Sequence, residues 1–167
     1  MSITFSTADL YDQFEEQLGV CEPIFADFGG REAFFGQTVT VKCFEDNSRI
    51  KEMLAQPGQG RVLVADAGGS VRCAMLGDLI AESAVDNGWA GVIIDGCVRD
   101  SARLAELDLG IKALATIPRK STRRGEGQVD LPIDVAGVRI NPGNWIYCDV
   151  DGILVAEQEL PLPNDLG

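Results

Sequence analysis

The chain has 167 residues, of which 24% are charged and 46% hydrophobic, and it contains no histidine. This length predicts a single domain, residues 1–167, that buries one sizeable core. The lack of histidine excludes a Ser-His-Asp triad, a Cys-His pair, a His-ligated zinc site and a histidine general base. Any proton transfer must therefore use carboxylates, Lys, Tyr, Cys or metal-bound water.

The charge balance narrows the range of partners. The chain has 26 acidic and 14 basic residues, a net charge of -12, and such a surface repels nucleic-acid phosphates and anionic lipid. We therefore expect no direct nucleic-acid binding and no membrane partner. The basic stretch 119–124 is a local exception, which we interpret as a solvated loop because it lies among Ser, Thr and Gly. An acidic surface can still bind a basic patch on another protein.

Cysteine usage and the N-terminus bear on the compartment. The five cysteines are widely spaced and show no metal-binding pattern. Residues 1–14 lack the basic and apolar segments of a secretory signal, and no apolar run approaches the ~20 residues of a membrane span. Reduced thiols, no signal and no span together predict a cytoplasmic protein.

The first predicted element is a helix that is capped by Ser6 or Thr7 and runs to about Leu18. Its apolar residues Leu10, Phe14 and Leu18 recur every four positions, which predicts one buried stripe.

Three elements are expected next. A strand over 37–43 alternates Val and Cys with Thr and Lys, so we expect one covered face. A short helix over 48–54 follows it. Residues 61–66 form an apolar run that is typical of a strand buried on both faces, and 68–70 form a glycine-containing loop.

The middle of the chain repeats strand–helix units. A helix over 79–87 has Asp78 at or beside its N-cap. A buried strand over 89–95, a helix over 101–107 and a strand over 111–117 follow.

The C-terminal part changes to short strands, expected over 129–135, 138–140, 145–149 and 153–156. The segment 149–152 resembles a calcium loop only superficially and is interpreted as a hairpin turn. Residues 161–167 are expected to form a loose tail. Strand–helix units followed by a β-rich end predict an α/β (α+β) domain.

Polar residues stand at two places where ligands are expected. Gly77 and Asp78 begin a helix, where free backbone N–H groups bind carboxylates or phosphates, and Arg99 and Asp100 follow a buried strand. The twenty residues between Asp78 and Arg99 span one helix and one strand, so both ends are expected to share a cleft at the carboxyl edge of the sheet. Two structural alternatives stay open: Asp78 caps its helix, and Arg99-Asp100 forms a surface ion pair and a helix cap.

A cleft with two carboxylates, a guanidinium and a helix N-terminus suits a divalent metal on oxygen ligands, beside groups that grip an anionic substrate. Oxygen-only ligation favours Mg²⁺ or Mn²⁺ over Zn²⁺. Four lysines are considered as Schiff-base nucleophiles and set aside, because none is expected beside this cleft: Lys42, Lys51, Lys112 and Lys120.

The spacing of Asp78 and Arg99-Asp100, within GDLIAESAVDNGWAGVIIDGCVRD, resembles the motif of the class II 4-hydroxy-4-methyl-2-oxoglutarate aldolase family. The chain also resembles the related regulators of ribonuclease E activity, through the segments VKCFEDN, GRVLVADAGGSVR and IPRKSTRRGEG. The resemblance covers about residues 4–157 and leaves 158–167 as a tail. It implies a swivelling β/β/α sandwich, assembled as a homotrimer with clefts at the subunit interfaces.

The resemblance also implies roles for single residues. Asp100 would be the direct ligand of a Mg²⁺ or Mn²⁺ ion, and Arg99 would bind the pyruvyl moiety and its developing enolate. Asp78 would orient metal-bound water. The substrate carboxylate would be held by the backbone of four consecutive residues, Gly77, Asp78, Leu79 and Ile80.

The implied reaction cleaves 4-hydroxy-4-methyl-2-oxoglutarate, a small-molecule 2-oxo acid, to two pyruvates. Metal and Arg stabilise the pyruvate enolate, and oxaloacetate decarboxylation forms the same enolate, so a decarboxylase side activity is expected. Aldolases of this family often carry an acid three positions after the metal-binding Asp, where this chain has Arg103.

The competing hypothesis is a non-enzymatic regulator that binds ribonuclease E, with the acidic surface masking a basic, RNA-binding segment of the partner. The regulators typically lack the Arg-Asp pair, which is intact at Arg99-Asp100. This pair favours catalysis.

Overall fold

The computed structural model describes residues 4–162. The strands are β1 (Leu18–Val20), β2 (Ala26–Asp27), β3 (Phe34–Lys42), β4 (Val62–Asp66), β5 (Ala74–Leu76), β6 (Gly91–Val98), β7 (Gly110–Thr116), β8 (Gln128–Val129), β9 (Ile133–Val135), β10 (Val138–Ile140), β11 (Trp145–Asp149) and β12 (Gly152–Ala156). The helices are α1 (Thr7–Phe14), the 3-10 helix η1 (Glu15–Gln17), α2 (Ser48–Leu54), α3 (Asp78–Asp86) and α4 (Ser101–Leu104).

Ten of these strands form one mixed sheet, in the order β1-β12-β11-β3-β4-β6-β7-β2, with β5 paired to β6 and β8 to β3. The run β3-β4-β6-β7 is parallel, whereas β11, β12, β1 and β2 are antiparallel to their neighbours. β9 and β10 form a separate two-stranded sheet. The predicted mixed α/β class is confirmed.

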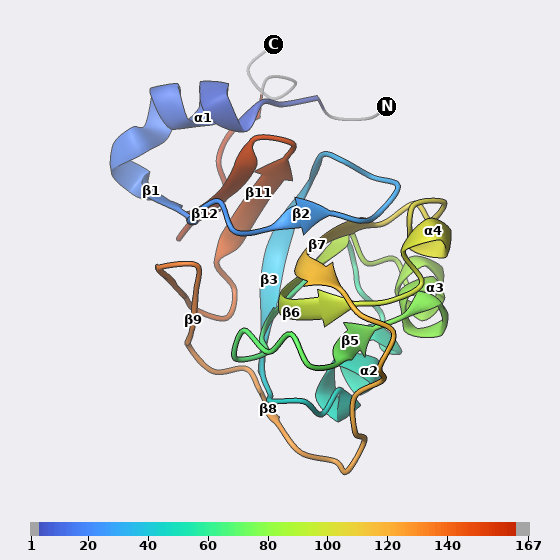
Figure 1. Ribbon diagram of the computed structural model, residues 1–167. Coiled ribbons are helices and arrows are strands. Elements are labelled where there is room, and N and C mark those ends of the chain that lie inside the picture. The colour runs from blue at the N-terminus through green and yellow to red at the C-terminus, as the bar shows by residue number, and fades with distance from the viewer. Residues whose placement is uncertain (1–3, 163–167) are drawn as a thin grey trace.

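The helices lie in two places (Figure 1). α2, α3 and α4 are grouped beside the parallel strands, and α1 lies by β11 and β12 at the other end of the molecule. Among residues 4–162, no helix is long and apolar enough to span a membrane.

The first helix is shorter than predicted. The Ser6 hydroxyl accepts a hydrogen bond from the backbone N–H of Asp9 at 3.3 Å and so caps α1, as expected. The helix ends at Phe14, and Leu18 begins β1, because its backbone pairs with Ala156 of β12. Even so, Leu10 and Leu18 belong to one apolar cluster, so the predicted contact surface is retained despite the change of backbone.

The expectation that β3 has only one covered face is wrong. Thr38 and Thr40 are buried like their neighbours Val39 and Val41, because segments from the C-terminal part cover that face and form hydrogen bonds with the hydroxyls. The Thr40 hydroxyl donates to the Leu131 carbonyl at 2.6 Å and accepts from the Leu131 N–H at 3.1 Å. Buried hydroxyls that are satisfied in this way lose little by leaving water.

One close approach in the centre of the sheet requires glycine. The buried ring of Phe34, on β3, lies against Gly91 of β6 and Gly110 of β7, and a Cβ at either glycine would collide with ring carbons. The ring therefore packs directly on the backbone of two adjacent parallel strands.

The middle elements follow the prediction with two differences. α2 and α3 match the expected helices within one residue, but α4 ends at Leu104 rather than near residue 107. The three-residue strand β5 was not predicted, because a segment this short shows no period.

The β-rich end is confirmed, with the expected strand 129–135 divided into β8 and β9. β11 and β12 form a hairpin in which Asp149 pairs with Gly152, so the segment 149–152 is a turn as predicted. The loose tail expected over 161–167 is wrong as far as residue 162, because Leu162 is buried, together with the preceding Leu160, beside α1, β11 and β12. Residues 163–167 lie outside the described part.

All five cysteines are buried and free. Burial is the main cause that raises the pKa of both Cys21 and Cys43 to about 12. Thiols with such pKa values are protonated at neutral pH and do not act as nucleophiles.

Candidate active site

The candidate site lies where β5 and β6 end. These strands are parallel, with Leu76 in register with Val98, so the residues that follow them emerge side by side. The backbone N–H of Arg99 donates to the Leu76 carbonyl at 2.9 Å. The two polar pairs predicted to share a cleft are therefore brought together, through a strand that the sequence did not reveal.

Asp100 links the starts of two helices. Its backbone is left-handed, with φ 60°, and it stands at the N-cap of α4 without a capping hydrogen bond from its side chain. Its carboxylate instead accepts a hydrogen bond from the backbone N–H of Asp78, with 3.0 Å between Asp78 N and Asp100 Oδ2. A non-glycine residue held at positive φ is a feature that gathers at functional sites. The alternative that Asp100 merely caps its helix is wrong.

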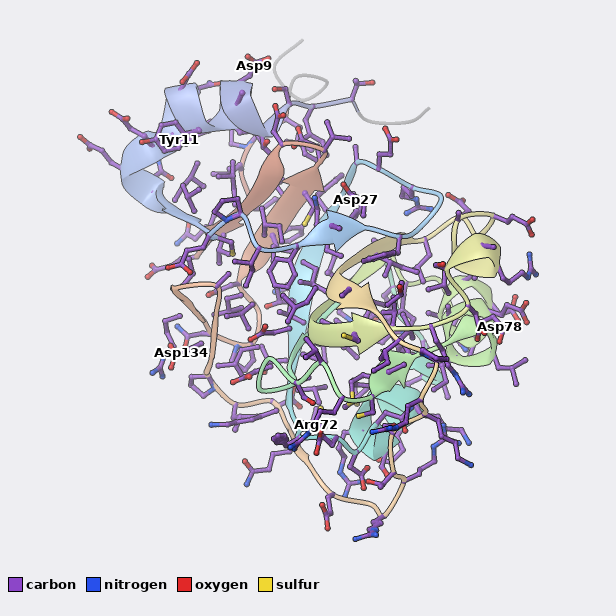
Figure 2. All side chains as sticks on the ribbon, in the orientation of Figure 1. Asp9, Tyr11, Asp27, Arg72, Asp78 and Asp134 are labelled. Atoms are coloured by element: carbon purple, nitrogen blue, oxygen red, sulfur yellow. The ribbon has the colours of Figure 1, made fainter. Side chains whose placement is uncertain are left out.

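Gly77 makes this junction possible. A Cβ at Gly77 would lie 2.9 Å from Asp100 Oδ2 and 3.4 Å from Arg99 Nε. Gly77, not Asp78, occupies the N-cap of α3, and Asp78 is the first residue of the helix. Asp78 is labelled beside this helix in Figure 2. The Asp78 side chain makes no capping bond within the described chain, so the capping alternative is wrong here too.

Arg99 is not part of a surface ion pair among residues 4–162. Its Nη1 approaches the Pro118 carbonyl at 3.4 Å, a long hydrogen bond. The guanidinium therefore keeps most of its donors available to a bound anion.

A cavity of about 640 Å³ opens at this junction. It is lined by Asn47, Lys51, Ala74, Leu76, Gly77, Asp78, Leu79, Ile80, Arg99, Asp100, Lys120, Ser121, Thr122 and Arg123. All six residues predicted for the site are among them. Leu79 is 75% exposed, which is unusual for leucine and leaves an apolar side chain at the edge of the cavity.

The sequence did not reveal one wall of the cavity. The segment after β7 returns past β5 and α2 (Figure 1), through bridges from Lys120 to Ala74 and from Thr122 to Asp46. The stretch 119–124 is thus more than a solvated loop, although most of it is exposed. A signal was present in the four basic residues within six positions, but their spacing does not show which part of the chain they meet.

Two of the four lysines, Lys51 and Lys120, line the cavity, contrary to expectation. Lys42 is exposed on β3, as expected. Lys112 is 3% exposed, and its Nζ lies 2.6 Å from the Asp149 carbonyl and 3.0 Å from Asp27 Oδ1, so it is fixed in a structural contact away from the cavity.

The cavity offers few side-chain ligands to a metal ion. Within residues 4–162, no three or more His, Cys, Asp or Glu side chains are grouped so that they could hold a metal ion. Asp100 uses Oδ2 for the Asp78 N–H, and its Oδ1 accepts no hydrogen bond within the described residues. A single hard carboxylate oxygen fits Mg²⁺, which keeps several waters and binds proteins through one or two carboxylates.

Arg103, where an acid was expected from the resemblance, is occupied elsewhere. Its guanidinium pairs with Glu82 of α3 at 2.8 Å and with Glu106 at 3.0 Å. The side chain therefore joins α4 to α3 on the surface.

Comparison with known proteins settles the family. The model of the RraA-like family, described as Aldolase/RraA, matches residues 7–155. The chain belongs to the RraA-like family. The family, the resemblance and the mixed α/β fold predicted from the sequence are all confirmed.

Three relatives of this RraA-like chain carry different names. A protein of Alkalilimnicola ehrlichii with the provisional name 4-hydroxy-4-methyl-2-oxoglutarate aldolase is 54% identical over 92% of this chain and 96% of its own length. A Geobacillus kaustophilus structure named S-adenosylmethionine:2-dimethylmenaquinone methyltransferase has a TM-score of 0.92 at 46% identity, covering 93% and 97% of the two chains. The RNA-processing inhibitor RraA from Thermus thermophilis has a TM-score of 0.91 at 40% identity, covering 95% and 96%.

Proposed function

We propose that this protein is a divalent-metal-dependent class II aldolase that cleaves 4-hydroxy-4-methyl-2-oxoglutarate to two pyruvates. The observation that carries the proposal is the junction of Asp100, Arg99 and the N-terminus of α3 in one cavity. The provisional aldolase names of relatives at about 50% identity support the same lyase activity.

Substrate binding uses the start of α3 and Arg99. The backbone N–H groups of Leu79 and Ile80 lie in the first turn, where they have no partner inside the helix. They bind the carboxylate next to the oxo group, and Arg99 binds the oxo oxygen. Asp100 would hold Mg²⁺ or Mn²⁺ through its carboxylate.

Cleavage of the bond between C3 and C4 needs two proton movements. The C4 hydroxyl loses its proton, the C4 oxygen becomes the oxo group of one pyruvate, and the bonding electrons pass to the enolate of the other. A metal ion held by Asp100 would supply Lewis-acid stabilisation of that enolate. Arg99 adds a fixed positive charge beside the same oxygen, and Asp78, which lines the cavity, accepts the hydroxyl proton through water and returns it to C3. No histidine is needed.

Oxaloacetate decarboxylation follows from the same arrangement. Loss of CO₂ from oxaloacetate leaves the enolate of pyruvate, which Arg99 and the α3 amides would hold in the same position. We expect this reaction as a slower side activity.

The direct test is pyruvate release from both substrates with Mg²⁺, with Mn²⁺ and with EDTA. Asp100→Ala should abolish metal-dependent release, and Arg99→Ala should raise KM and lower kcat. Asp12→Ala, at an exposed position of α1, is the control and should match the wild type. Full activity of Asp100→Ala at saturating Mg²⁺ would rule out the metal role of Asp100.

A second candidate function is supported by the likeness to the RNA-processing inhibitor and by the net charge of -12. In this proposal, the acidic surface binds a basic segment of ribonuclease E. The complex should weaken with salt and survive Asp100→Ala. Absence of retention on immobilised ribonuclease E at low ionic strength would remove this function.

The homotrimer and its interfacial clefts belong to the proposal as well. Light scattering of the purified protein should give three times the mass of one chain. A monomer that is fully active would show that the cavity of one chain is sufficient.

A further inference from the structure

The cavity holds more positive charge than the proposed reaction uses. Four basic side chains line it, against the two carboxylates of Asp78 and Asp100, although the chain as a whole carries a net charge of -12. Arg99 has its place beside the enolate. The other three come from α2 and from the segment after β7: Lys51, Lys120 and Arg123.

None of these three side chains is neutralised by a carboxylate within residues 4–162. Six other basic residues do form such ion pairs: Arg31, Arg49, Arg72, Arg103, Lys112 and Arg139. In a protein with 26 acidic residues, partners are plentiful, so a cluster of unpaired cations in one cavity indicates an anionic ligand.

Arg123 is held in position for such a ligand. Its Nε donates to Oδ1 of Asn47 at 3.2 Å, and Asn47 in turn donates from Nδ2 to the Met75 carbonyl at 3.2 Å. Both terminal guanidinium nitrogens of Arg123 lack a hydrogen-bond partner among the described residues. A guanidinium fixed at Nε with its terminal nitrogens free is suited to a carboxylate.

Ser121 adds an independent observation. Its hydroxyl is buried and has no hydrogen-bond partner among residues 4–162, and the residue lines the same cavity. Buried hydroxyls are almost always bonded. A ligand oxygen that lies between Lys120 and Arg123 would accept a hydrogen bond from the Ser121 hydroxyl.

We infer that Lys120, Ser121 and Arg123, assisted by Lys51, form a subsite for the second carboxylate of a 2-oxo dicarboxylate, the carboxylate remote from the oxo group. The inference rests on the proposed function, because that function places the 2-oxo acid end at Arg99 and α3. The protein then selects dicarboxylates over 2-oxo monocarboxylates of the same length.

The test compares two unreactive ligands by titration calorimetry in the presence of Mg²⁺. 2-Oxoglutarate and 2-oxopentanoate have the same five-carbon chain, both lack the 4-hydroxyl needed for cleavage, and only the first has the remote carboxylate. Wild type should bind 2-oxoglutarate about 10- to 100-fold more tightly, the range of a charge-assisted hydrogen bond. The double variant K120M/R123M should lose this preference and keep its affinity for 2-oxopentanoate.

Two further variants sharpen the result. Arg124→Met alters an exposed neighbour that does not line the cavity, so the preference should stay at the wild-type value. Ser121→Ala should weaken only 2-oxoglutarate, without lowering the urea midpoint, because the hydroxyl has no protein partner to lose.

Because binding is measured without turnover, failure of the aldolase proposal can be recognised separately. Wild type that prefers 2-oxoglutarate but releases no pyruvate supports the subsite and overturns only the reaction. Equal affinities in wild type, no binding of either acid, or a preference that survives in the double variant overturns the subsite.

Discussion

Thr7 donates two hydrogen bonds to the carboxylate of Asp149, from its backbone N–H at 2.7 Å and from its hydroxyl at 2.6 Å. The first residue of α1 is thereby joined to the last residue of β11, 142 positions away. Both residues are buried, so the contact is protected from water.

Thr7→Val should lower the free energy of unfolding by about 1–3 kcal/mol, because the buried Asp149 carboxylate loses a donor while the shape of the side chain is kept. Urea unfolding measures the change. Thr116→Val, at an exposed position of β7, is the matched control and should stay near wild type. Equal stability of both variants would show that the backbone N–H groups of Thr7 and Asp151 are enough to satisfy the Asp149 carboxylate.

Lys112→Met should destabilise the fold by about 1–3 kcal/mol. Lys112 is buried, and its ammonium joins the exposed Asp27 of β2 to the carbonyl of Asp149. Its removal leaves that carbonyl without this donor and the Asp27 carboxylate without its partner. The exposed Lys42→Met is the control in the same urea experiment. Asp27→Asn with Lys112→Met should recover part of the loss, since the uncompensated charge is removed.

Gly77→Ala should lower the activity and leave the stability nearly unchanged. The added Cβ would stand 2.9 Å from Asp100 Oδ2, and a displacement of this carboxylate should lower kcat/KM about 100-fold. The φ of Gly77 is -130°, which alanine adopts readily, so the melting temperature should change little. Wild-type kcat/KM in Gly77→Ala would mean that the position of Asp100 does not limit catalysis.

Acid should weaken the attachment of the segment 122–126 to α2. Burial raises the pKa of Asp46, but hydrogen bonds from Ser48 and from the backbone of Arg124 and Glu126 outweigh it and hold the pKa below its usual 3.8. A carboxyl with a lowered pKa stabilises the fold above its ordinary pKa, and this contribution is lost as pH falls through the lower value of the folded state.

The stability difference between wild type and Asp46→Asn should therefore be constant near neutral pH and shrink below about pH 3.8. Urea unfolding at a series of pH values measures it. A difference that grows on acidification would contradict the sign of the pKa shift.

The thiols should not react with a thiol reagent while the protein is folded. All five cysteines are buried, and the pKa values of Cys21 and Cys43 are raised to about 12. A thiol reagent at pH 8 should therefore modify none of them until denaturant is added, and then all five. Rapid modification of one thiol without unfolding would identify a local opening.

Much of the site was predictable because it depends on local rules. Parallel strands end at one edge of a sheet, and one helix and one strand separate Asp78 from Arg99. These two facts were enough to predict a shared cleft. The role of Gly77 was beyond such rules, since its close contact with Asp100 appears only in three dimensions.

The features that the sequence did not predict depend on contacts between segments that lie far apart in the sequence. Asn47 and Arg123 are 76 positions apart, and neither has a pattern that indicates the other. The burial of Thr38 and Thr40 likewise depends on the carbonyls of Asn141 and Leu131, so alternation of apolar and polar residues gave the wrong answer for that face of β3.

The packing of the Phe34 ring against Gly91 and Gly110 limits the substitutions that this chain tolerates at these three positions. A larger residue at either glycine would collide with the ring. A smaller residue at position 34 would leave a cavity above the two glycines. The three positions are therefore free to vary only together. Divergent sequences of this fold should replace the aromatic ring and gain side chains on β6 or β7 in the same lineage.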